Sequence, residues 1–253
     1  KDQFSRLLKR QDFEPRNLTQ LRTHSFQQFL ETGFPTQKWE NWRFTNLKNL
    51  KKETFRISET QDLPEKLPDL KSYDIPSVDT LVIINGHYQP ELSSSTPSVT
   101  VETLLEFYQS NPQRFSINAS NPFHILNTAF MDSGLAVTIR KNSVLKQPLR
   151  FLFLFTSLRE NIMISPQIHV VAEENSSGEI IEQITGNIHR SSFLNLVGCI
   201  SLSQNSFLDY TRILNGQSVP NQFADFHVEQ GRDTRFRFFQ YAEARPLCRL
   251  DMD

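Results

Sequence analysis

Three side chains able to bind a transition metal recur at one position of a repeated strand pattern. Aligning the second half of the chain on a repeat of about 30 residues superposes His169, Cys199 and His227. Imidazole and thiolate are suitable ligands for zinc or iron, and neighbouring strands would stack the three at strand spacing. We expect the three side chains to be exposed and to point away from the interior. Three exposed residues in a column do not require a metal ion. The sequence therefore leaves metal-binding and cofactor-binding residues unassigned.

A group of glutamates in the same half offers a second kind of chemistry. Glu173, Glu174, Glu179 and Glu182 could act as paired carboxylates on a sugar polymer, if they converged on one groove with basic partners. They do not recur at matching positions of the repeat. We therefore expect no catalytic residues and no enzyme, and keep a β-helix polysaccharide lyase or hydrolase as the alternative function.

Composition and charge exclude several further classes. The 27 basic and 28 acidic residues give a formal net charge of -1, so no positive field gathers phosphates and no nucleic-acid partner is expected. No apolar run approaches the roughly 20 residues of a membrane span, and the N-terminus lacks a signal-peptide core. Two cysteines are too few for a disulfide framework. These features predict a cytoplasmic protein without a membrane partner.

The first part of the chain predicts helices followed by a linker. Asn17 can cap an amphipathic helix that Gly33 and Pro35 end, and a shorter amphipathic piece follows. Residues 1–56 are therefore predicted to be helical. Residues 57–79 are predicted to be a linker, because their prolines and charged residues block both helices and strand ladders.

The remaining residues, 80–253, predict a mainly β domain. Its short strands are separated by recurring steps at Asn142, Asn175 and Asn205, which lie 33 and 30 residues apart, with a possible fourth step at Asp233. A repeat of about 30 residues built only of strands indicates a solenoid. We predict a right-handed parallel β-helix, with an antiparallel sandwich as the alternative. We also expect the chain to be a fragment that stops inside an unfinished strand near its C-terminus.

One strand of this domain is apolar on both faces. Residues 149–155 read Leu-Arg-Phe-Leu-Phe-Leu-Phe, so one face can fill the interior while the other must also be covered. We expect the N-terminal helices of the chain to cover it, with a partner protein as the alternative. The aromatic residues at 236–241 also need a cover for their outer face, either the N-terminal helices or a partner protein.

Two segments resemble a known family. Residues 33–47, GFPTQKWENWRFTNL, resemble the N-terminal signature of SufD proteins, a G-x-P-x-x-x-x-E-x-W-R-Y/F-T-x-L/I pattern that packs the helical region. Residues 122–130, with Gly134 and the Gln-Pro-Leu at 147–149, resemble the start of the β-helix in that family. The matches run with gaps from about residue 33 to the end of the chain.

The resemblance implies a non-catalytic scaffold subunit of the SufBCD complex, which assembles iron–sulfur clusters. Such a subunit pairs through its β-helix with SufB or with a second copy of itself, and engages the ATPase SufC. It implies that this chain binds no cofactor stably, although a transient iron–sulfur cluster can form at a subunit interface. The helical domain that docks SufC in this family, and its interface histidine, match no residue among these 253.

Overall fold

The computed structural model describes residues 1–10, 14–59, 62–65, 69–111, 120–156, 161–187, 192–215, 220–243 and 247–253. The helices are α1 (Asp2–Arg10), α2 (Arg16–Thr32), α3 (Leu104–Ser110) and α4 (Pro122–Phe130), with short 3-10 turns η1 (Glu40–Trp42), η2 (Leu50–Lys52), η4 (Leu70–Tyr73) and η5 (Pro90–Leu92). The strands are β1 (Arg56–Ile57), β2 (Asp79–Ile84), β3 (His87–Gln89), β4 (Val99–Thr103), β5 (Ser133–Ile139), β6 (Leu149–Phe155), β7 (Ile162–Ile164), β8 (Pro166–Ala172), β9 (Ser177–Gly186), β10 (Phe193–Leu202), β11 (Phe207–Leu214), β12 (Asn221–Gln230), β13 (Arg235–Ala242) and β14 (Cys248–Met252). Among the described residues, no helix has both the length and the apolar character needed to span a bilayer.

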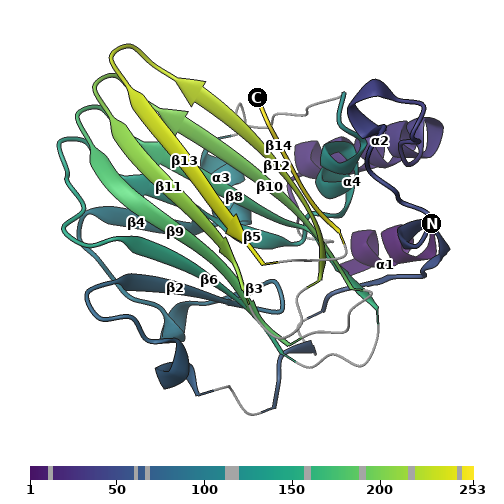
Figure 1. Ribbon diagram of the computed structural model, residues 1–253, viewed down its shortest axis with the longest axis horizontal. Helices are drawn as coiled ribbons and strands as arrows, with labels where there is room; N and C mark the ends of the chain where they lie inside the picture. The colour runs from purple at the N-terminus through teal and green to yellow at the C-terminus, as the bar shows by residue number, and fades with distance from the viewer. Residues whose placement is uncertain are drawn as a thin grey trace.

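The strands wind into a parallel β-helix with two sheets (Figure 1). We call the sheet that contains β5, β8, β10, β12 and β14 sheet A, and the sheet that contains β6, β9, β11 and β13 sheet B. From β8 onward the chain alternates between the two sheets, and each strand pairs in parallel with the strand two places later. The predicted mainly β fold with a parallel β-helix is confirmed, and the antiparallel sandwich is wrong.

Left-handed residues turn the chain at one corner of every coil. Asn142, Asn175, Asn205 and Asp233 have φ of 59°, 57°, 58° and 57°, a conformation that asparagine and aspartate tolerate better than other side chains. Asn175 Nδ2 donates to Asn142 Oδ1 at 2.9 Å, and Asn205 Nδ2 donates to Asn175 Oδ1 at 3.2 Å. The repeated steps therefore stack in register, the fourth included.

The two apolar faces of β6 have different partners. Phe151 and Phe153 lie in the core between the sheets. Leu152 and Leu154 face outward and are buried in a separate cluster, with Leu63, Leu70, Tyr73 and Leu92 packed against it. The chain thus covers this face itself, but with residues from the predicted linker and from η5 instead of the N-terminal helices. Leu70 and Tyr73 belong to the short turn η4, whose cap, Asp69, accepts a hydrogen bond from Lys71 N at 3.0 Å.

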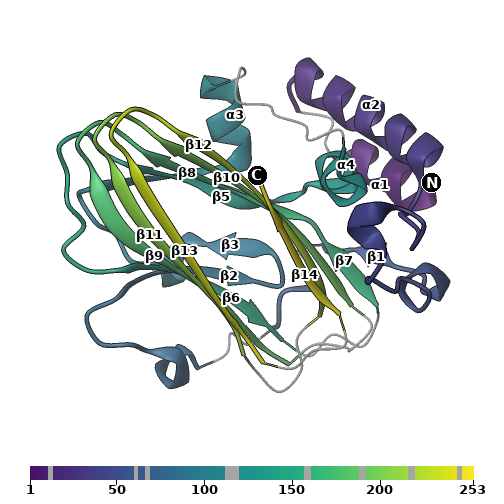
Figure 2. The same cartoon turned by 45° about the horizontal axis from the view of Figure 1, so that its top comes forward.

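The N-terminal helices pack on the outer side of sheet A instead. Figure 2 shows α1, α2 and α4 grouped beside that sheet, where α4 contacts both α2 and β10. Where the sequence predicts a second amphipathic helix, the chain forms the two 3-10 turns η1 and η2. The boundaries at residues 56 and 79 stay predictions, and β1, at residues 56–57, already pairs with β7 of sheet A.

Candidate functional site

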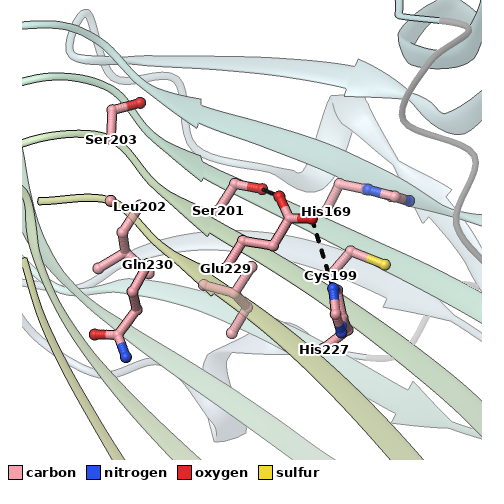
Figure 3. Close-up of a pocket in the computed structure, with 10 residues that line it drawn as sticks. His169, Cys199, Ser201, Leu202, Ser203, His227, Glu229 and Gln230 are labelled. Carbon is pink, nitrogen blue, oxygen red and sulfur yellow. Dashed lines mark hydrogen bonds and ion pairs between the residues drawn. The ribbon is translucent and has the colours of Figure 1, made fainter. Parts of the chain in front are cut away.

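The predicted column of His169, Cys199 and His227 exists. Cys199 on β10 lies in register with His169 on β8 and with His227 on β12. Their neighbours along the strands, among them Ile168 and Ile200, belong to the core between the sheets, so the column faces outward. Figure 3 shows the three side chains on one wall of an open pocket of about 520 Å³. The repeat alignment from the sequence is therefore confirmed at all three residues.

His169 is buried, contrary to the expectation that the whole column is exposed. Only 3% of the residue is exposed, because α3 packs over it, with the Phe107 ring centred 4.8 Å from the imidazole. The Tyr108 hydroxyl lies 2.8 Å from His169 Nε2 and donates to Gln167 Oε1. Burial raises the pKa of Tyr108 well above its usual value, and the nearby Cys199 adds to this rise. The phenol therefore stays protonated at neutral pH and acts as a hydrogen-bond donor.

His227 occupies the more open end of the column. Its side chain is 35% exposed, and its Nδ1 lies 3.2 Å from Asp253 Oδ1. Its Nε2 lies 3.6 Å from Glu229 Oε1, and Ser201 Oγ lies 3.5 Å from the other oxygen of that carboxylate (Figure 3). These contacts give His227 two acidic neighbours on its own face of sheet A.

The column is not a preformed metal centre. Across the described parts of the chain, no three His, Cys, Asp or Glu side chains are grouped so that they could hold a metal ion. His169 is turned to Tyr108 and His227 to Asp253, which separates the imidazoles at the two ends of the column. The arrangement forms a polar pocket wall with one thiol at its centre, and metal-binding residues stay unassigned.

The four glutamates considered for sugar chemistry do not converge. Glu182 points into the β-helix interior, where it is fully buried beside Arg212. Glu173 and Glu174 lie at a corner of the coil, where both accept hydrogen bonds from Lys141. Glu179 is exposed on β9. Because one carboxylate is enclosed and the others are spread over the corner and the outer surface, no glycosidase-like pair exists among them.

A second depression joins the sequence signature to the last strand. It has a volume of about 340 Å³, and its lining includes Trp42, Asn121, Asp225, Arg249 and Asp251. The Arg249 guanidinium lies 3.9 Å from the centre of the Trp42 ring. Sequence reasoning missed this site, because residues about 200 positions apart meet there and only the tryptophan carried a signal.

Asp225, which lines this depression, is in contact with the buried His124. His124 Nδ1, on α4, lies 2.7 Å from Asp225 Oδ2, on β12, and their side chains are 1% and 7% exposed. The contact ties the helical layer to sheet A through a buried polar pair, which is costly to break once desolvated. The contact therefore holds α4 against β12 beside the second depression.

Comparison with known proteins places this architecture in a family. Residues 2–151 match the family model described as the SufBD protein N-terminal region. The chain is 28% identical over 237 residues to an iron–sulfur cluster assembly SufBD family protein of Synechocystis sp., which covers 86% of this chain and 52% of the relative. It is 39% identical over 70 residues to the iron–sulfur cluster assembly protein SufD of Escherichia coli, which covers 28% of this chain and 16% of that protein.

The chain thus spans about half the length of the first of these relatives. The matched region includes the signature at residues 33–47 and extends to β6, within the first coil of the β-helix. Since the family model covers more than half of its residues, the chain belongs to the SufBD family.

Proposed function

We propose that this chain is a non-catalytic scaffold subunit in the assembly of iron–sulfur clusters, working in the cytoplasm. The observation that carries the proposal is the match of residues 2–151 to the SufBD family, together with relatives whose names place them in iron–sulfur cluster assembly. The expected partners are the ATPase SufC and either SufB or a second copy of this chain. The whole complex would contain the catalytic ATPase, while this subunit would supply a rigid surface.

The shape of the β-helix supports a scaffold role. At its N-terminal end the antiparallel strands β3 and β4 cover the edges of the two sheets. From β8 to β14, each strand bonds in parallel to the equivalent strand of the next coil. Coils stacked in this way present long, regular outer faces on which a partner can dock. We assign subunit pairing to one of these outer faces.

Exposed aromatic residues mark the outer face of sheet B as the face that we assign to pairing. Phe239 and Tyr241 on the outer face of β13 are 63% and 54% exposed. They stand in register beside Thr211 and Ile213 of β11, on the face of sheet B that Leu63 and Tyr73 cover further along, at β2 and β6. Large apolar side chains in such a position gain free energy when a partner covers them.

An iron–sulfur cluster would be cargo on this surface. We propose that this chain holds no cluster stably and that a transient cluster forms at the interface with the partner subunit. The scattered glutamates give no support to the alternative of a polysaccharide enzyme.

Co-purification tests the proposal. The full-length protein is expected to recover SufC together with SufB or a second copy, and Phe239→Asp combined with Tyr241→Asp is expected to weaken the pairing. Leu30→Asp is the matched control, because Leu30 is 50% exposed but lies on α2. Failure to recover an ATPase, together with turnover of a uronic-acid polymer, would reverse the assignment.

A further inference from the structure

A tight turn in the signature segment presents an apolar side chain to solvent. Thr45 N donates to Trp42 O at 3.0 Å, which closes a four-residue turn with Arg43 and Phe44 at its tip. Phe44 is 92% exposed, the largest value among the exposed large apolar side chains of the described residues. The resemblance to the family pattern implies that this signature packs the helical region. Phe44 departs from that expectation, because it faces solvent.

Both ends of this turn are fixed to the folded body. Trp42 is only 4% exposed, and its ring stacks on Phe123 with centroids 5.2 Å apart. Arg249, on the last strand, lies over the Trp42 ring and donates from Nη1 to Thr45 Oγ1 at 3.1 Å. Phe44 is therefore exposed on a turn that the fold already holds in place. Because the turn is preorganised, it would lose little conformational entropy when a partner binds.

The segment that carries the turn is basic, although Asp225, Asp251 and Asp253 line the depression beside Trp42. Residues 36–52 contain five basic side chains and one acidic side chain, although the whole chain has a net charge of -1. The Arg43 guanidinium lies 5.6 Å from the centre of the Phe44 ring. Gln37 Nε2 donates to Arg43 O at 3.4 Å and ties the preceding turn, with exposed Lys38 near its tip, to this one. The apolar tip thus lies beside the Arg43 cation on a segment rich in basic residues.

We propose that the turn at residues 42–45 is a docking site for an acidic protein segment that carries an apolar or aromatic side chain. The apolar side chain packs on Phe44, and carboxylates pair with Arg43 and Lys38. Charge complementarity selects this occupant, because opposite charges beside a small apolar anchor fix register and speed association.

Two other classes of partner fit the turn less well. A membrane surface is bound by the long apolar face of an amphipathic helix, whereas this turn presents one aromatic tip. Single-stranded nucleic acid is bound by several aromatic rings along a positive groove. The site is also separate from the pairing surface on β13, because the turn packs against residues of α4 and sheet A and not against sheet B.

Fluorescence anisotropy with a defined probe tests this inference. The probe is a fluorescein-labelled peptide of glutamate and phenylalanine, and its counterpart has lysine in place of glutamate. We expect the full chain to bind the acidic peptide, with binding weakened by salt. Phe44→Ala and Arg43→Ala should each weaken it roughly tenfold, as expected for the loss of an apolar anchor or of a paired charge. Leu30→Ala, which removes an exposed apolar side chain from α2, should leave it unchanged.

No binding of the acidic peptide, or binding that Phe44→Ala leaves unchanged, removes the docking site. Binding only to vesicles that contain anionic phosphatidylglycerol, or only to single-stranded DNA, also overturns it and assigns the turn to that class. Circular dichroism of each variant separates a lost contact from a lost fold. Phe44 is not part of the β13 surface, so a Phe44→Ala variant should still recover SufC in the co-purification test. Loss of peptide binding with recovery of SufC therefore separates this test from that of the proposed function.

Discussion

Glu182 and Arg212 form a fully buried ion pair in the interior of the β-helix. Glu182 Oε1 lies 2.7 Å from Arg212 Nε, and both side chains are 0% exposed. The residues stand in register on β9 and β11. Tyr210 donates its hydroxyl to the second Glu182 oxygen at 2.7 Å, and Arg212 Nη1 donates to Gln240 at 2.9 Å. The pair thus connects three successive coils through polar contacts inside an otherwise apolar core.

Replacing only the cation should destabilise the protein strongly. Arg212→Met leaves the Glu182 carboxylate buried without its charge partner, which costs about 3–5 kcal/mol of unfolding free energy. Urea unfolding monitored by circular dichroism measures the change.

The matched control removes both charges. Combining Glu182→Leu with Arg212→Met should recover most of that stability, since an apolar pair of similar volume is often as stable as a buried ion pair. A single Arg212→Met variant as stable as the wild type would show that the pair is not formed in solution.

Tyr210 should make the stability of the protein sensitive to alkaline pH. Burial raises the pKa of Tyr210 well above its usual value, and the neighbouring Glu182 carboxylate adds to the rise. Above about pH 10 the unfolded chain loses the phenol proton while the folded chain keeps it, so the free energy of unfolding falls with rising pH. The slope for one such group is about 1.4 kcal/mol per pH unit.

Tyr210→Phe isolates this contribution. The variant is expected to be less stable near neutral pH, because Glu182 loses a buried donor. Its urea-unfolding free energy should fall less steeply above about pH 10 than that of the wild type, because the phenol is absent. Tyr108, whose pKa burial also raises, titrates in both proteins. Equal slopes in the two proteins would contradict the burial of the Tyr210 hydroxyl.

The asparagine corners make a prediction about backbone conformation. Asn175 has φ of 57° and shares side-chain hydrogen bonds with Asn142 and Asn205. Asn175→Ala should cost about 1–2 kcal/mol, because alanine tolerates a left-handed conformation poorly, whereas Asn175→Gly should cost less. Thermal and urea unfolding compare the two. Gln204→Ala, an exposed residue of the next corner, is the control; equal losses for alanine and glycine would count against a strained corner.

The column of His169, Cys199 and His227 is not expected to bind a metal ion. Since His169 bonds to Tyr108 and His227 to Asp253, Cys199→Ser should leave the metal content of the purified chain unchanged. Elemental analysis by mass spectrometry measures this directly. Loss of a stoichiometric metal ion in the variant would show that the column rearranges to form a centre.

The repeat of the β-helix was predictable from local chemistry. Asparagine or aspartate at a fixed position of each coil supplies the left-handed turn, and β9, β11 and β13 show the alternating burial of a strand with one buried face. The register of His169 with Cys199 follows from that spacing alone. The fold class therefore depends on signals that each lie within a few residues of sequence.

Long-range coverage was not predictable in the same way. The sequence does not show that α3 lies over His169 or that η4 covers the outer face of β6, because both contacts depend on where a connecting segment returns. The interior position of Glu182 was also missed. An alternating strand pattern identifies a buried face. A charged residue on that face is expected to be buried only when its partner on the next coil is known.

The most direct test of a scaffold role is the yield of iron–sulfur cluster in a reconstituted system. SufB and SufC, supplied with iron, a sulfur donor and ATP, are compared with and without the full-length protein, and cluster formation is followed by visible absorbance. Adding the protein is expected to increase the amount of cluster formed. An identical yield with and without the protein would contradict the proposal that it is a subunit of the assembly machinery.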